Sequence, residues 1–153
     1  MSEAPSLMPV ADARARILDA MSTVSIESVS LAQARGRVLA KDILARVTQP
    51  PVAVSAMDGY AVRARDVAAV PATLTVIGEA PAGGAFEGDI GEGQAVRIFT
   101  GGPVPTGATA IVIQEDTERN QDQVTVLEAV TEGRFIRPAG LDFSAGDVGL
   151  EAG

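Results

Sequence analysis

From Val52 onward, the sequence is a series of short β-branched and aliphatic runs separated by glycine and proline. Runs of this length and composition are typical of strands, because branched side chains pack well on a pleated surface. The glycines and prolines between them are the residues that tight turns require. The sequence therefore predicts a small antiparallel β-barrel or sandwich, with strands at 59–63, 74–78, 95–99, 110–114 and 124–126.

The residues before Val52 have a different pattern. Apolar side chains at Val10, Ile17 and Met21, with Asp and Arg between them, predict an amphipathic helix over 10–21. Pro9 precedes this stretch and suits the start of a helix.

A second helix and an arm are predicted between this helix and the β region. Ser30 stands three residues before Gln33, the spacing of a capping box, and Gly36 is placed to end a short helix through 34. Residues 38–47 are rich in aliphatic side chains and predict a long strand or arm that stops at the prolines 50–51. The fold class expected is α+β, mostly β.

Composition limits the chemistry that the chain can perform. It has no Cys and no His among 153 residues, which removes thiolate nucleophiles, zinc–sulfur sites and the commonest general base. Any metal site would be lined by oxygen, which favours Mg²⁺ or Ca²⁺. The net charge of −8 argues against nucleic acid and membrane surfaces as partners. Without a bilayer-spanning run or signal peptide, a cytoplasmic location is expected.

Asp58 is the first candidate functional residue. It precedes Gly59 at the start of a predicted strand, where its carboxylate is available to Mg²⁺ or to a polar substrate group. The simpler interpretation is a turn in which Gly59 takes a positive φ and Asp58 caps its own backbone.

The segment 100–105, TGGPVP, is the second candidate. Adjacent glycines at Gly101 and Gly102 allow N–H groups to converge on an oxyanion, and the Thr100 hydroxyl adds a donor. A plain loop with a rigid exit is the alternative.

Two further polar segments follow. Residues 114–118 are acidic and predict a solvated turn. In the last loop, Arg137 is able to pair with an oxyanion, while Asp142 is able to cap Ser144 or Ala145 in an Asx turn.

Five ordered segments resemble the molybdopterin molybdenumtransferases, a family that includes the C-terminal region of gephyrin. The segments read GRVLAKD at 36–42, SAMDGYA at 55–61, RIFTGGPVP at 97–105, QEDT at 114–117 and IRPAGLDF at 136–143. Two positions depart from the usual motifs. Gly102 replaces a more usual Ala, which is expected only to loosen the loop, and Leu141 stands where Glu is frequent.

The resemblance implies an enzyme that inserts molybdate into adenylylated molybdopterin, uses Mg²⁺, releases AMP and works as a homodimer. It implies an extended subdomain from 1–46 with 134–153 and an inserted β-domain at 47–133. The family's α/β pterin-binding domain is expected to be absent, so the isolated chain should be inactive. The implied site residues are Asp58, Thr100 and Asp142 as catalytic, and Ser55, Gly101, Gly102 and Arg137 as substrate-binding.

Two other interpretations remain open. One is a non-catalytic module of the same fold that serves dimerisation or partner binding. The other is a Mg²⁺-dependent phosphate-ester hydrolase, which rests only on the carboxylate and the glycine-rich loop.

Overall fold

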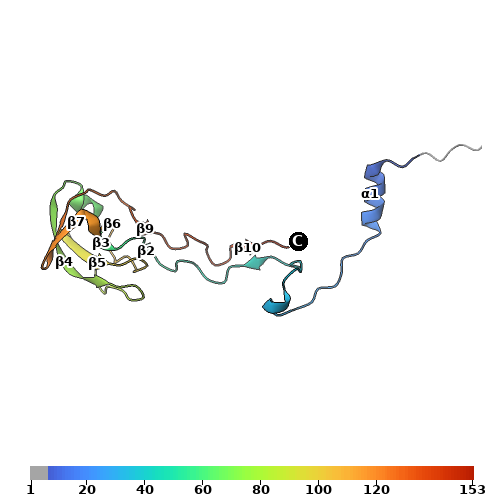
Figure 1. Ribbon diagram of the computed structural model, residues 1–153, viewed down its shortest axis with the longest axis horizontal. Coiled ribbons are helices and arrows are strands. Elements are labelled where there is room, and N and C mark those ends of the chain that lie inside the picture. The colour runs from blue at the N-terminus through green and yellow to red at the C-terminus, as the bar shows by residue number, and fades with distance from the viewer. Residues whose placement is uncertain (1–6) are drawn as a thin grey trace, which may run out of the picture. The chain divides into compact units, whose positions relative to one another are not determined.

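The computed structural model describes residues 7–153, which divide into two compact units (Figure 1). Residues 7–41 form the first unit together with Ala152 and Gly153, and the Gly153 amide donates to the Leu39 carbonyl at 3.1 Å. The second unit, Asp42–Glu151, contains every strand of the described residues. The predicted division at 46/47 and 133/134 stays a prediction.

The first unit contains α1 (Val10–Asp19) and the single 3₁₀ turn η1 (Leu31–Gln33). The helix begins directly after Pro9, as expected, and all of its residues are at least partly exposed. The predicted capping box does not form. The Ser30 hydroxyl donates to the Gln33 side chain at 3.0 Å and caps no backbone N–H. Within residues 7–153, no helix is long and apolar enough to cross a bilayer.

The second unit is built on a curved six-stranded sheet in the order β6-β3-β5-β4-β8-β7 (Figure 1). The strands are β3 (Gly59–Val62), β4 (Ala72–Ala80), β5 (Gln94–Ile98), β6 (Ala110–Ile113), β7 (Thr117–Asn120) and β8 (Gln123–Val126). Five of them match the predicted strands, and the α+β, mostly β fold class is confirmed. Two short 3₁₀ helices lie between strands, η2 (Ala64–Val67) and η3 (Gln114–Asp116).

Both faces of this sheet are buried. Alternate residues of β3 belong to different core clusters, because successive side chains of a strand point to opposite faces. Tyr60 and Val62 pack with the valines of β8 on one face, and Ala61 packs with Ile98 and Ile111 on the other. With few aromatic residues in the chain, valine, isoleucine and alanine fill most of the core.

The sheet is mixed rather than antiparallel, because β4 pairs with β5 in parallel. A parallel pair needs a crossover of a dozen or more residues, and the segment 81–93 supplies it. The Ile90 amide anchors this crossover by donating to the Thr106 carbonyl at 2.8 Å.

The acidic segment 114–118 is largely exposed, as expected of a solvated turn, but only its first three residues form a turn. It forms η3 and the start of β7, which pairs with β8 through Glu118 and Thr125. A charged strand is compatible with this position because β7 is an edge of the sheet.

Two extended segments complete the second unit and run antiparallel to each other. They pair as β1 (Ile43–Leu44) with β10 (Val148–Leu150), and as β2 (Val54–Ser55) with β9 (Ile136–Arg137). Of the stretch 38–47, only the two residues of β1 form a strand, so the arm interpretation is the correct one.

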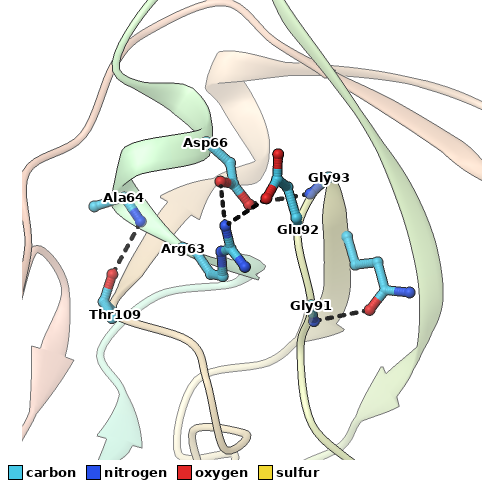
Figure 2. Close-up of polar contacts among 8 residues, drawn as sticks. Arg63, Ala64, Asp66, Gly91, Glu92, Gly93 and Thr109 are labelled. Atoms are coloured by element: carbon cyan, nitrogen blue, oxygen red, sulfur yellow. Dashed lines mark hydrogen bonds and ion pairs between the residues drawn. The ribbon is translucent and has the colours of Figure 1, made fainter.

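A largely buried ion pair fastens the end of β3 to the crossover (Figure 2). Arg63 Nη2 donates to Asp66 Oδ1 at 2.9 Å, and the two side chains are 13% and 9% exposed. The other Asp66 oxygen accepts the Gly93 amide at 3.1 Å, immediately before β5. Glu92 lies 3.6 Å from the same guanidinium but is 88% exposed.

Candidate active site

Asp58 and Thr100 are joined directly, although 42 positions separate them in the sequence. Asp58 precedes β3, and Thr100 follows shortly after β5. Because β3 and β5 are antiparallel with Gly59 opposite Ile98, the start of one strand meets the end of the other. The Thr100 amide and hydroxyl both donate to Asp58 Oδ1, at 2.8 and 2.7 Å. This contact brings together the two segments that the sequence singled out independently.

These hydrogen bonds set the ionisation of Asp58. The Thr100 amide and then the Thr100 hydroxyl hold the pKa of Asp58 below its ordinary value of 3.8, with a further contribution from the positive charge of Arg97. Asp58 is therefore a carboxylate at neutral pH. A weakly basic carboxylate is better suited to bind a cation or a hydrogen-bond donor than to remove a proton. Within residues 7–153, its Oδ2 accepts no hydrogen bond and is available for such a role.

We expect an NMR titration of Asp58 to give a pKa below 3.8, and Thr100→Ala to raise it towards that value. The two hydrogen bonds from Thr100 to Asp58 contribute to the free energy of unfolding above pH 3.8. This contribution is lost as the pH falls through the lowered pKa of Asp58 in the folded state. Thr100→Ser keeps both donors and serves as the matched control. A pKa in Thr100→Ala that stays as low as in the wild type would contradict the assignment.

The turn interpretation of Asp58 and Gly59 is wrong in its details. Asp58 reaches across to Thr100 instead of capping its own turn. The local turn is held by Ser55, whose hydroxyl donates to the Met57 carbonyl at 2.6 Å and accepts the Met57 amide at 3.2 Å. Gly59 does not have a positive φ; its Cα instead lies close to the backbone of β6.

Ser55 is almost fully buried, at 1% exposure, and joins the glycine-rich loop through its backbone. Its amide donates to the Gly102 carbonyl at 2.9 Å, and its carbonyl accepts the Gly101 amide at 2.9 Å. Ser55 thus supports the loop that carries Thr100, and its predicted contact with substrate stays a prediction.

The oxyanion-binding concavity expected at 100–102 is not formed by this loop. The Thr100, Gly101 and Gly102 amides donate to Asp58, to Ser55 and to Phe99, so all three are already engaged. The expectation that Gly102 only loosens the loop is also wrong. A Cβ there would lie 2.7 Å from the Ala80 carbonyl oxygen, so this conformation requires glycine.

Arg137 and Asp142 form a separate pair. Arg137 Nη2 donates to both Asp142 oxygens, at 2.8 and 2.9 Å. Arg137 lies opposite Val54, and Ser55 lies opposite its neighbour Ile136. The Asx turn expected at Asp142 is wrong, since Asp147 caps Ser144 and Thr48 binds the Ala145 amide.

Sequence reasoning missed Arg97 as a member of this region. Its guanidinium donates to the Gln114 side chain at 2.7 Å and lies over the rings of Tyr60 and Phe99. The sequence carries no local signal for this role, because it depends on strand register: Arg97 pairs with Tyr60, two residues after Asp58.

The described residues supply only part of a metal site. Among residues 7–153, no three acidic side chains converge on one point. Asp58 Oδ2 fits as one oxygen ligand, and the Thr100 hydroxyl oxygen lies beside the same carboxylate. Mg²⁺ commonly takes one or two protein carboxylates and completes its shell with water and substrate phosphates. Asp58 is compatible with that arrangement, provided that other ligands come from outside these residues.

Comparison with known proteins assigns the family. Residues 8–153 match the family described as "MoeA N-terminal region (domain I and II)". The chain belongs to this family. Its sequence is 44% identical over 130 residues to molybdopterin molybdenumtransferase 2 of Mycobacterium tuberculosis (strain ATCC 25618 / H37Rv), covering 82% of this chain and 32% of that protein. It is 40% identical over 124 residues to the molybdopterin molybdenumtransferase of Nostoc sp. (strain PCC 7120), covering 78% and 28%.

Solved structures agree with this membership of the MoeA N-terminal family. The crystal structure of the molybdopterin biosynthesis moeA protein from Pyrococcus horikoshii OT3 superposes with a TM-score of 0.83 at 38% identity. That match covers 97% of this chain and 40% of the Pyrococcus chain. The chain therefore spans well under half of the relatives that it matches.

Proposed function

We propose that this chain contributes the Asp58–Thr100 pair to a molybdopterin molybdenumtransferase site that inserts molybdate into adenylylated molybdopterin and releases AMP. The observation that carries the proposal is the direct bond between two motif residues from distant segments, at 2.7 Å. It is supported by the names of the relatives and by the family match over 8–153.

In this proposal, Asp58 acts as a fixed negative charge. Its lowered pKa keeps it ionised, and Thr100 fixes its orientation through two donors. Such a carboxylate is suited to hold Mg²⁺ against the phosphates of an adenylylated substrate. Asp58 would hold the ion, which would supply positive charge to the phosphates. Gly101 and Gly102 place Thr100 beside Asp58, so they act on substrate through the shape of the loop.

Arg137 and Asp142 complete the proposed set. The side chains of Arg137 and Asp142 are 43% and 41% exposed. An anionic group of the substrate could therefore reach Arg137 and replace Asp142 as its partner.

We further propose that the protein acts as a cytoplasmic homodimer, with the arm as part of the interface. The support is an apolar groove of about 590 Å³ along β1 and β10, lined in part by Ile43, Leu44 and Leu150. Exposed apolar patches of this kind mark interaction surfaces. The division into 1–46 with 134–153 and 47–133 belongs to the same proposal.

A chimera tests the proposed function. This chain would replace the matching segment of the Nostoc relative, and AMP release from adenylylated molybdopterin with molybdate and Mg²⁺ would be measured. We expect the chimera to turn over within about tenfold of the Nostoc enzyme, since fixed geometry is retained. The 153-residue chain alone, which covers only 28% of that relative's length, is expected to give no turnover.

Folding of the chimera would be checked by cooperative thermal unfolding, with the Pyrococcus protein as a second acceptor. A folded but inactive chimera would contradict the transferase proposal and favour the non-catalytic module. Failure to fold in both acceptors would also count against it, because the segment would then not be interchangeable.

A further inference from the structure

We infer that Arg97 is a positioning residue for this site, because one guanidinium joins the three segments that hold Asp58 and Thr100. This inference rests on the proposed function for its consequence in catalysis, but its structural content can be tested without turnover.

The contacts of Arg97 reach the neighbours of both residues. Its Nη1 lies 3.3 Å from the carbonyl oxygen of Gly59, the residue after Asp58. Its Cζ lies 4.8 Å from the ring centroid of Phe99, the residue before Thr100. Arg97 therefore ties the start of β3 to the end of β5, where the two functional side chains meet.

The third segment is reached through Gln114. Arg97 Nη2 donates to Gln114 Oε1 at 2.7 Å, and the Gln114 amide donates to the Asp58 carbonyl at 3.1 Å. A closed path thus runs from the guanidinium through Gln114 back to the backbone of Asp58. Displacement of Arg97 would therefore loosen the backbone of Asp58, although the bonds from Thr100 remain.

The contacts of Arg97 require the planar guanidinium group of arginine. The guanidinium lies over the Tyr60 ring at 5.2 Å as well as over Phe99, and it donates to two oxygen atoms at the same time. A lysine ammonium is a compact charge that cannot stack and has no fixed fork. Lysine would retain the positive charge near Asp58 but lose the connection between the segments.

The other ionisable groups around Arg97 are few. Glu79 is its register partner on β4, Tyr60 is its partner on β3, and Glu115 follows Gln114 in η3. None of these groups is altered by the substitution Arg97→Lys, so a change at Asp58 would report the loss of positioning.

The test compares Arg97→Lys with the wild-type 153-residue chain by NMR. If Arg97 acts only through charge, the lysine variant keeps the chemical shift and the hydrogen-exchange rate of the Thr100 amide, which donates to Asp58; if it positions, both change. We expect an upfield move of the Thr100 amide proton and faster exchange as its bond to Asp58 weakens. The Val76 amide, which donates to Asp122 at 2.7 Å in another part of the sheet, should not move.

Two further variants make the test decisive. Arg119→Lys, on the exposed edge strand β7, is the matched control and should leave both signals unchanged. Gln114→Ala removes only one anchor, so it should move the same signals in the same direction by less, even if Arg97→Lys folds poorly. Wild-type values of the Thr100 amide shift and exchange rate in both Arg97→Lys and Gln114→Ala would overturn the inference.

In the active chimera, Arg97→Lys is expected to lower kcat about tenfold while KM changes less than about twofold, because geometry rather than binding is lost. An inactive chimera would count against the proposed function alone, since the NMR readings decide the role of Arg97 without turnover. A rise in KM with unchanged kcat would indicate that Arg97 binds substrate, which would overturn the positioning role.

Discussion

Gly59→Ala is expected to unfold much of the six-stranded sheet. A Cβ at this position would lie 2.0 Å from the carbonyl oxygen of Val112 and 2.9 Å from its carbonyl carbon. Both atoms belong to the backbone of β6, which pairs with β3 and cannot retreat without breaking that pairing. We expect a loss of at least about 4 kcal/mol in the free energy of unfolding, measured by urea denaturation. Such a loss approaches the whole stability of an ordinary domain.

Two variants separate the effect of a steric clash between strands from the effect of an unfavourable backbone conformation. Gly83 has a φ of +78° and open space around its Cα, so Gly83→Ala should lose only about 1–2 kcal/mol from the left-handed conformation. If Gly59 were needed for a positive φ, asparagine would be tolerated better than alanine. Because a Cβ of either residue meets the same backbone, Gly59→Asn should lose at least as much stability as Gly59→Ala. A Gly59→Ala variant no less stable than Gly83→Ala would show that the strands do not approach as closely as described.

Asp66→Ala is expected to have the second-largest effect on stability. It would leave the Arg63 side chain, which is 13% exposed, with Glu92, at 3.6 Å, as its one remaining acidic partner among residues 7–153. Arg63 Nε already has no hydrogen-bond partner among residues 7–153, so little compensation is available. The Gly93 amide would also lose its acceptor. Removing one member of a buried ion pair typically costs about 3–5 kcal/mol, and we expect the lower part of this range by urea denaturation.

Glu92→Ala is the matched control for Asp66→Ala. Glu92 contacts the same guanidinium, but it is 88% exposed and therefore well screened by water. Its loss should change the free energy of unfolding by less than about 0.5 kcal/mol. Equal effects of the two substitutions would contradict the structural role given to Asp66. Figure 2 shows why they should differ, since only Asp66 also binds the Gly93 backbone.

The strands of the β region were predictable because their signal is local. Branched and aliphatic runs between glycines and prolines located β3, β5 and β6, most of whose residues are buried. The parallel pairing of β4 with β5 was not predictable in the same way. It depends on the path of the crossover 81–93, whose anchor is a hydrogen bond between Ile90 and Thr106.

The contact between Asp58 and Thr100 was not predictable from local physics. Turn chemistry suggested that Asp58 caps itself, but the carboxylate instead accepts two hydrogen bonds from a residue 42 positions away. Strand register decides this contact, and no local pattern reports register. The same reason explains Gly102, where a close approach to Ala80 became visible only once β4 was placed beside β5.

The most direct test of the central claim is AMP release by the chimera carrying Asp58→Asn. Asparagine keeps an oxygen for both Thr100 donors, so the variant removes the charge while preserving the geometry. We expect turnover to fall at least about 100-fold, because a fixed charge that stabilises a developing charge is lost. Glu118→Gln, on the exposed β7, should leave turnover unchanged. Turnover by Asp58→Asn within about twofold of the unsubstituted chimera would contradict the role of Asp58, since lost electrostatic stabilisation costs far more.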